Sequence, residues 1–584
     1  MYSSNYDKNP VVKVPDYAKH CWAGWPDITK QIADKVSALS KDVKIIVVEC
    51  YHGVIDKEIA DQLNKAFSDS TFFYSSQAML ADSEINNKLQ PDITNDELFG
   101  YMTRYNMDCY FDQQKVELMR KEIHSIKQGT IIIYGTGAAY IQPQSDILVY
   151  ADMARWEIQL RFRRNEISNI GINNNNERPS LQYKRAFFTD WRICDRFKKI
   201  LMHRCDFVLD TNIQHQPKMA TGEAVKAGLK QAVKQPFRVV PFFDPGPWGG
   251  QWLKKVCDLD SSEVNFAWGF DCVPEENSLL LGFGDINFEI PSINLVFAHP
   301  DQLLGEPVHG RFGDEFPIRF DFLDTMQGGN LSLQVHPLTE YIQEKFGMHY
   351  TQDESYYILE AEDDAVVYLG LKNDVVPDDM ISEMKEAQSS GVFDAEKHVG
   401  VYQIKKHDHV LIPAGTVHCS GANAMVLEIS ATPYIFTFKL WDWGRLGLDG
   451  RPRPINISHG EKVIQWDRRE SWVKKEILSC VTTIAEGDGW KEERTGLHER
   501  EFIETRRHWF TKPVLHQTNG SVNVLNLIEG REAVIESPSG AFLPFVVHYA
   551  ETFIIPEAIK EYTIRPCGES EGKQCATIKA YVRH

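Results

Sequence analysis

The chain has 584 residues and a formal net charge of −19 at pH 7. This length exceeds what one hydrophobic core supports, so we expect two to four domains. The negative charge argues against binding to nucleic acid or to an anionic membrane surface. The N-terminal residues contain no apolar signal segment, no apolar run reaches transmembrane length, and the 11 cysteines are scattered singly. These features predict a cytoplasmic protein.

The first part of the chain alternates between strand-like and helix-like patterns. Its β-branched and apolar runs predict strands at 44–48, 130–134, 147–151 and 207–209. Helical patterns follow the first of these runs at 59–67 and the third at 153–164. This alternation is typical of a parallel sheet that is covered by helices on both faces. We therefore assign residues 1–234 to one α/β domain.

The turn after the first predicted strand, Glu49 to Glu58, lies where a phosphate-binding P-loop would lie. A P-loop has the pattern G-x-x-x-x-G-K-[ST], because its glycines let backbone N–H groups surround a phosphate. Most of these glycines are missing here, and Glu49 and Asp56 place negative charge in the turn. We expect no nucleotide binding at this turn.

A later stretch of the same domain contains Arg161, Arg163 and Arg164 and the triplet Thr189-Asp190-Trp191. It resembles the nucleoside-kinase and uridine-kinase group, which implies a degenerate P-loop-kinase-like domain. The arginines could clamp phosphates in such a domain, but three arginines on one helix more often form a solvated face.

After residue 234 the sequence changes to short apolar runs separated by Gly, Pro and Asp. Such spacing predicts all-β sandwich or barrel architecture. Helical patterns at 381–389 and 465–475 interrupt it. We expect one β-barrel over 235–464 and a second over 465–584.

Three short motifs in the first barrel carry potential metal ligands. Gln334 and His336 are two residues apart in a strand-like run, so their side chains can face the same way. Glu354 begins another strand-like run, and His418 follows a Pro-Ala-Gly turn. Nitrogen and oxygen ligands of this kind suit zinc or another divalent metal.

Further motifs occur in order around these three. They are Trp248-Gly249-Gly250, Phe316-Pro317, Leu323-Asp324, Val426-Leu427-Glu428-Ile429-Ser430 and Leu440-Trp441-Asp442-Trp443-Gly444-Arg445. Together with the metal motifs, they resemble the type I mannose-6-phosphate isomerases from about residue 240 onward. The resemblance implies cupin (jelly-roll) barrels and an interconversion of mannose 6-phosphate and fructose 6-phosphate through an enediol. It also implies one Zn²⁺ per chain, held by Gln334, His336, Glu354 and His418.

The resemblance implies catalytic roles for Glu428, Lys439, Asp442 and Arg445. Proton transfer between the substrate's C1 and C2 needs a nearby base, and Glu428 is our candidate for it. Arg445 could neutralise a developing oxyanion or could simply pair with Asp442. Lys439 stands where the family usually has arginine, and it lacks the two-pronged guanidinium.

Two further positions depart from the family pattern, because Asp321 and Gln352 replace lysines that would favour a phosphate. We assign Asp321 and Gln352, together with Arg319 and Ser332, to the substrate-binding site, although Arg319 could instead pair with Asp321. Two alternatives therefore stay open: an isomerase or epimerase of a non-phosphorylated or differently charged sugar, and a non-catalytic sugar-sensing protein. In each case the expected partner is a small sugar or sugar phosphate.

Overall fold

The computed structural model describes residues 4–431, 434–447, 450, 453–496 and 498–584. Its contacts divide the chain into two compact units. One unit, here the α/β unit, contains Val11–Gln231 and Ser278–Ala298. The other, here the β unit, contains the residues up to Pro10 together with Ala232–Asn277 and His299–His584. Among the described residues, no helix is both long and apolar enough to cross a membrane.

The α/β unit is built around a seven-stranded sheet with the order β2-β8-β7-β6-β3-β5-β4. The neighbours from β7 to β4 run parallel, and β8 and β2 are antiparallel to their neighbours. The strands are β2 (Cys21–Ala23), β3 (Val43–Cys50), β4 (Thr71–Tyr74), β5 (Gly129–Gly135), β6 (Ile147–Asp152), β7 (Phe207–Asp210) and β8 (Lys218–Thr221). A second sheet contains β1 (Val11–Lys13), β11 (Ser278–Phe283) and β12 (Ile286–Pro291).

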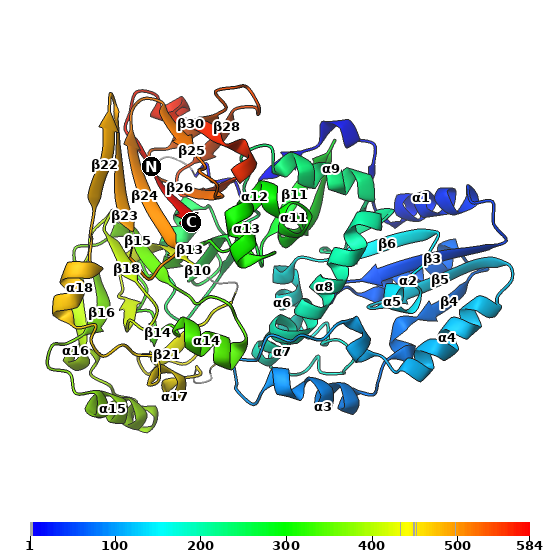
Figure 1. Cartoon of the computed structure of the whole chain (residues 1–584), viewed down its shortest axis with the longest axis horizontal. Coiled ribbons are helices and arrows are strands. Elements are labelled where there is room, and N and C mark those ends of the chain that lie inside the picture. The colour runs from blue at the N-terminus through cyan, green and yellow to red at the C-terminus, as the bar shows by residue number, and fades with distance from the viewer. Residues whose placement is uncertain (1–3, 432–433, 448–449, 451–452, 497) are drawn as a thin grey trace. The chain divides into compact units, whose positions relative to one another are not determined.

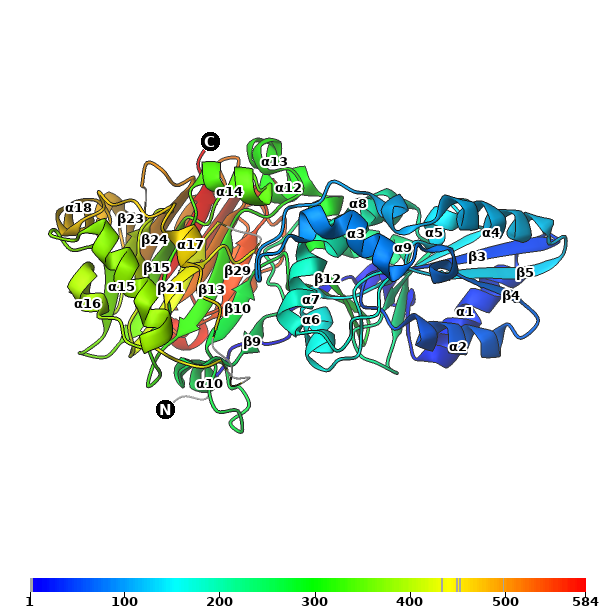
Figure 2. The same cartoon turned by 90° about the horizontal axis from the view of Figure 1, so that it is seen from below.

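Helices cover both faces of the seven-stranded sheet, with α1 and α2 on one side and α4 and α5 on the other (Figure 2). The helices of this unit are α1 (Trp25–Ser37), α2 (Asp56–Ala66), α3 (Asp82–Ile93), α4 (Gln113–Ser125), α5 (Ala138–Ile141), α6 (Arg155–Arg163), α7 (Pro179–Arg185), α8 (Trp191–Leu201), α9 (Gly222–Ala232) and α11 (Ile293–Ala298). Ile28 and Ile32 of α1 pack with Ile46 and Val48 of β3 in the core. The predicted α/β architecture is confirmed.

The three arginines of α6 do not share one environment. Arg161 is buried and donates hydrogen bonds to the backbone oxygens of Gly53 (2.9 Å) and Thr211 (2.8 Å). Arg163 and Arg164 are exposed. The interpretation of this helix as a solvated face is therefore wrong for Arg161, because the short connections after β3 and β7 leave carbonyl groups that its guanidinium satisfies.

The β unit begins with two antiparallel sheets, coloured green to yellow in Figure 1. Their orders are β18-β15-β20-β13-β10-β9 and β17-β16-β19-β14-β21. The strands of the first are β9 (Phe242–Asp244), β10 (Trp268–Cys272), β13 (Arg319–Asp324), β15 (Glu354–Ala361), β18 (His409–Ile412) and β20 (Ala424–Ser430). The strands of the second are β14 (Leu333–Val335), β16 (Val366–Leu371), β17 (Val399–Gln403), β19 (His418–Ser420) and β21 (Phe438–Trp441). We call this pair of sheets the first β region.

The tail forms two more antiparallel sheets, with orders β22-β23-β24-β31-β26-β29 and β25-β30-β27-β28. We call this pair the second β region. Its strands are β22 (Thr482–Gly487), β23 (Trp490–Gly496), β24 (Ile503–Phe510), β25 (Val514–Gln517), β26 (Asn523–Glu529), β27 (Glu532–Glu536), β28 (Phe545–His548), β29 (Thr552–Ile555), β30 (Glu561–Pro566) and β31 (Cys575–Val582). The helices of the β unit are α10 (Trp252–Val256), α12 (Pro300–Leu304), α13 (Glu306–Phe312), α14 (Thr339–Phe346), α15 (Pro377–Ser390), α16 (Ala395–His398), α17 (Ile457–Gly460) and α18 (Glu470–Glu476).

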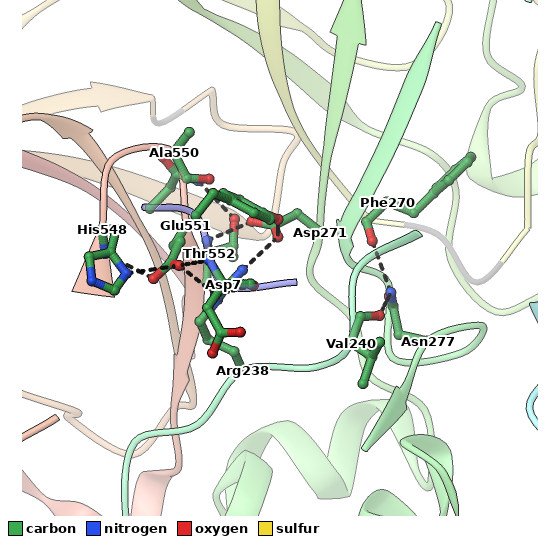
Figure 3. Close-up of polar contacts among 12 residues, drawn as sticks. Asp7, Arg238, Val240, Phe270, Asp271, Asn277, His548, Ala550, Glu551 and Thr552 are labelled. Carbon is green, nitrogen blue, oxygen red and sulfur yellow. Dashed lines mark hydrogen bonds and ion pairs between the residues drawn. The ribbon is translucent and has the colours of Figure 1, made fainter. Parts of the chain in front are cut away.

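A buried network around Arg238 ties the N-terminal segment to both β regions (Figure 3). The guanidinium donates to the backbone oxygens of Asp7 (2.8 Å) and Thr552 (3.1 Å). It also forms ion pairs with Asp271 (3.3 Å) and Glu551 (2.8 Å). A buried cation with two carboxylates and two carbonyls has its hydrogen-bonding groups satisfied, which is the condition for burying such charges.

This network explains one difference from the expected domain boundaries. Residues 4–10 lie in the β unit although the sequence places them in the α/β domain, and 278–298 lie in the α/β unit. Contacts also group the two β regions into one unit. The division at 234 and 464 stays a prediction.

Candidate metal centre

Three predicted ligands come together inside the first β region. His336 Nε2 lies 2.9 Å from Glu354 Oε2, and His418 Nε2 lies 2.8 Å from Glu354 Oε1. The candidate ligand atoms of the three residues all lie within 4.8 Å of one another, and all three residues are buried. The carboxylate therefore stands between the two imidazoles.

Each imidazole is oriented by a backbone carbonyl. His336 Nδ1 donates to Phe436 O (2.9 Å), and His418 Nδ1 donates to Thr416 O (2.8 Å). Because Nδ1 carries the proton in both rings, both Nε2 atoms keep their lone pairs for a ligand. This arrangement is typical of histidines that bind metals.

The fourth predicted ligand, Gln334, lies beside the other three. In β14 it is the register partner of His418 in β19, and its side-chain amide lies 3.2 Å from His418 Nε2. A rotation of the Gln334 amide by half a turn exchanges the positions of its oxygen and nitrogen, so the oxygen can face the space between His336, Glu354 and His418. The structure thus brings all four predicted ligands together.

The charges at this centre suit a cation. Burial raises the pKa of Glu354, but His336 and His418 outweigh it and leave the pKa well below its ordinary value. Burial lowers the pKa of His336, but Glu354 outweighs it and the pKa is raised. Glu354 Oε1 and His336 Nε2 have no well-oriented hydrogen-bond partner among the described residues. Such orphaned buried atoms fit a bound divalent cation.

The candidate base lies on the facing six-stranded sheet. Register pairs Glu428 of β20 with Asp321 of β13 and with Tyr356 of β15, so their side chains share one face of the sheet. The next row on that face contains Arg319, Ser430 and Glu354. Glu428 is therefore two residues along its strand from the row that contains a metal ligand.

Burial raises the pKa of Glu428 well above its ordinary value, and Asp321 and Glu354 raise it further. Its Oε1 has no hydrogen-bond partner among the residues that the structure describes. Arg319 forms a two-pronged ion pair with Asp321, with Nε–Oδ1 2.9 Å and Nη2–Oδ2 3.2 Å. Of the two expectations for Arg319, the structure thus shows the pairing with Asp321.

Gln352 contacts the metal centre itself. Its Nε2 donates to Glu354 Oε2 (3.0 Å), and its Oε1 accepts from Phe436 N (3.0 Å). Both ends of this buried amide are engaged within the protein. Gln352 therefore orients the candidate ligand Glu354, which sequence reasoning did not foresee.

The remaining site residues gather around Asp442. Its carboxylate accepts hydrogen bonds from Ser332 (2.8 Å) and from Arg445 (2.7 Å). Arg453 also binds it, with Nη1–Oδ2 2.8 Å. Lys439, the register partner of Gln334, has its pKa lowered to about 7 by burial and by Arg453. Two guanidinium groups and one hydroxyl therefore bind the Asp442 carboxylate.

Sequence reasoning missed Arg453. It lies in the run Arg451-Pro452-Arg453-Pro454, which belongs to no recognised motif. The available signal was a cluster of basic residues shortly after Asp442 and Arg445.

Comparisons with known proteins give two findings. The model of a domain of unknown function (DUF8485) matches residues 24–234. The mannose-6-phosphate isomerase ManA of Bacillus subtilis is 24% identical over 237 residues, which are 40% of this chain and 68% of that protein. The probable mannose-6-phosphate isomerase GmuF of the same organism is 25% identical, over 39% of this chain and 68% of that protein.

Solved structures show a similar pattern. The superposition on the crystal structure of the mannose 6-phosphate isomerase from Bacillus subtilis covers 59% of this chain and 99% of that chain. Its TM-score is 0.48, and the sequence identity is 18%. A putative mannosephosphate isomerase from Archaeoglobus fulgidus covers 60% of this chain, with a TM-score of 0.44 and 17% identity. Part of the chain is thus similar in sequence to proteins named mannose-6-phosphate isomerase, in agreement with the resemblance of its motifs.

Proposed function

We propose that the first β region is a metal-dependent isomerase that interconverts mannose 6-phosphate and fructose 6-phosphate. The observation that carries the proposal is the convergence of His336 Nε2 and His418 Nε2 on Glu354, beside Gln334. The relatives named mannose-6-phosphate isomerase support the same reaction.

Gln334, His336, Glu354 and His418 would hold the divalent cation, for which zinc suits the ligand types. Such a cation supplies Lewis-acid stabilisation of negative charge that develops on the substrate's oxygens. The hydrogen bonds around the ligands fix their geometry before substrate arrives. Gln352 donates to Glu354, and the two backbone carbonyls accept from the histidines.

Glu428 is the group that moves the proton in this proposal. As a carboxylate it takes the proton from C2 of the aldose, and as the acid it delivers a proton to C1 of the enediol. The ketose forms as the proton of the O2 hydroxyl passes to O1. A carboxyl group with a raised pKa suits both steps near neutral pH. Its position on the same sheet face as Glu354 supports this role, because a substrate bound at the metal centre would lie near it.

The phosphate would bind near the basic cluster of Lys439, Arg445 and Arg453. Asp442 neutralises one positive charge of this cluster. Arg453 thus offsets the loss of lysines at Asp321 and Gln352. Guanidinium groups bind phosphate oxygens with paired hydrogen bonds.

A second candidate is an isomerase of a non-phosphorylated sugar, and the Arg319–Asp321 pair favours it. The guanidinium of Arg319 is already paired with Asp321, so the pair offers little net positive charge to attract a phosphate. Assays with mannose 6-phosphate, free mannose and other aldoses separate the two candidates. A strong preference for the phosphorylated sugar would exclude the second.

The test of the reaction itself is proton exchange at C2 of mannose 6-phosphate in D₂O, followed by NMR. We expect Glu428→Gln to slow isomerisation by about 10²–10⁴-fold while metal content stays unchanged. Isomerisation at the normal rate in this variant would contradict the role of Glu428. Activity that survives complete removal of metal would contradict the whole proposal.

A further inference from the structure

The α/β unit contains a cavity of about 500 Å³ that the proposed isomerase does not use. It is lined by residues that follow three neighbouring strands: His52 to Asp56 after β3, Ser75 and Ser76 after β4, and Thr136 after β5. The segment from Glu166 to Asn173 closes another side. The carboxyl ends of parallel strands are where open α/β sheets bind their ligands, and the volume is that of a small-molecule site.

The glycine turn that follows Thr136 of the cavity wall has two backbone N–H groups that are already taken. Gly137 N and Ala139 N, in the glycine turn after β5, donate to the carboxylate of Glu49 at 2.7 and 2.8 Å. Glu49 is 1% exposed, so it is an internal part of the turn. These two N–H groups are therefore satisfied within the protein and are not free to bind an anion.

The wall of the cavity repels anions. It contains the carboxyl groups of Asp56, Asp82 and Glu166, and its described lining residues include no lysine or arginine. His52 adds no charge, because its Nδ1 accepts from Trp191 Nε1 (3.1 Å) while Nε2 donates to Ser168 O (3.1 Å), and burial lowers its pKa. A dianionic phosphate would be desolvated here without a counter-charge.

The same wall suits hydroxyl groups. Tyr74 donates to Asp56 Oδ2 (2.6 Å), and Asp82 Oδ2 accepts from Asn173 N (3.0 Å), which fixes both carboxyl groups in place. Ser76 and Thr136 add hydroxyls that can donate and accept, while apolar side chains such as Val54 and Leu80 cover the rest. Carboxyl oxygens and hydroxyls around an apolar floor match a ring that presents many O–H groups.

We propose that this cavity binds an uncharged polyhydroxylated compound, the class of free sugars and cyclic polyols, and rejects its phosphate esters. The geometry of the lining and the occupied glycine turn carry this proposal. It does not depend on the isomerase proposed for the β unit.

Saturation-transfer NMR and calorimetry on the full chain test the proposal, with D-mannose, D-ribose and myo-inositol as probes and ribose 5-phosphate as the charged counterpart of ribose. Ser76→Trp fills the cavity, and Asp56→Asn removes one fixed carboxylate. Asp61→Asn is the matched control, because Asp61 is exposed on the same helix, α2, and pairs with Lys57.

We expect at least one uncharged probe to bind, and Ser76→Trp and Asp56→Asn to weaken that binding by about tenfold or more, as for a lost hydrogen bond to a charged group. Asp61→Asn should leave the affinity unchanged. Only the binding that Ser76→Trp removes is counted, so ligands of the metal centre do not interfere. The proposal is overturned if no uncharged probe shows binding sensitive to Ser76→Trp, or if ribose 5-phosphate binds there more tightly than ribose.

Discussion

The two β regions each bury a pair of neighbouring histidines, yet only one pair forms a candidate metal centre. In the first region, the rings of His336 and His418 lie 4.9 Å apart, their Nδ1 atoms are held by carbonyls and Glu354 stands between them. In the second, the rings of His508 and His516 are 4.4 Å apart, but neither nitrogen of His516 has a hydrogen-bond partner among the described residues. Proximity of histidines is therefore insufficient.

The difference is how a carboxylate stands beside each pair. Glu354 lies within 2.9 Å of both imidazoles of the first pair. In the second pair, Glu492 Oε1 lies 3.4 Å from His508 Nε2 and is already paired with Arg506 (2.9 Å). Burial lowers the pKa of His516 well below its ordinary value, and His508 and Lys579 lower it further. Cations near a histidine pair oppose metal binding, whereas a carboxylate supplies both a ligand and the compensating charge. The comparison predicts that metal binding depends on Glu354 and leaves the second pair without metal.

Replacing Glu354 gives the largest expected effect. Glu354→Gln removes the charge between the histidines, so we expect metal affinity to fall by about 1,000-fold, as for a buried charge that loses its partner. Metal content after dialysis measures this. The matched variant His516→Phe, which keeps the stacking on Tyr562, should retain full metal content. Equal losses in the two variants would refute the comparison.

The second pair should respond to pH instead of to metal. Burial lowers the pKa of His508 from 6.5 to about 4. In the unfolded chain, His508 becomes protonated below about pH 6.5, whereas in the folded chain it stays neutral down to about pH 4. The free energy of unfolding therefore falls as the pH falls from about 6.5 to about 4. The loss amounts to about 3 kcal/mol for a shift of this size.

Hydrogen exchange of peptides from β24 in increasing urea, at pH 7.5 and pH 4.5, measures this loss. His508→Asn removes one of the two histidines with lowered pKa and should reduce the dependence on pH. Unchanged stability of the original chain at the lower pH would show that His508 is protonated when folded.

Gln352 is expected to affect metal binding at the first histidine pair through its hydrogen bond to Glu354. Gln352→Met removes the hydrogen bond to Glu354 Oε2, so we expect metal affinity to fall by about 10–100-fold, as for other residues that orient ligands. Calorimetric titration with zinc measures it. Gln343→Met on α14, where the amide is exposed, is the control. A change no larger than in the control would leave Gln352 without an orienting role.

Arg453 should give the smallest effect. Arg453→Met removes one cation from the cluster at Asp442, so we expect KM for mannose 6-phosphate to rise about tenfold with little change in kcat. Lys385→Met, on the exposed face of α15, controls for the loss of a charge. An equal rise in KM for free mannose would show that Arg453 does not contact the phosphate.

Much of this centre could be predicted from sequence, because its ligands lie within short motifs. Gln334, His336, Glu354 and His418 were all identified there, and the structure brings them together. The role of Gln352 could not be identified, since a hydrogen bond to Glu354 depends on the side-chain directions at the start of β15. Arg453 could not be assigned to the site from sequence, because it lies in a connection outside the predicted strands and motifs.

The fold shows the same limit. The short apolar runs after residue 234 predicted β architecture for the tail, but β23 and β24 do not consist of such runs. Their sequences contain many charged residues, which usually indicate exposed loops. The structure buries these groups by pairing them, as in Arg507 with Glu493 (2.8 Å). Pairing across strands cannot be inferred from the pattern of one strand.

X-ray absorption of the zinc-loaded protein tests the central claim most directly. The account predicts one zinc per chain with nitrogen and oxygen ligands at about 2.0–2.2 Å and scattering from two imidazoles. Glu354→Gln should lose this spectrum and His516→Phe should keep it. Sulfur ligands, or a spectrum that persists in Glu354→Gln, would contradict the assignment of the metal to His336, Glu354 and His418.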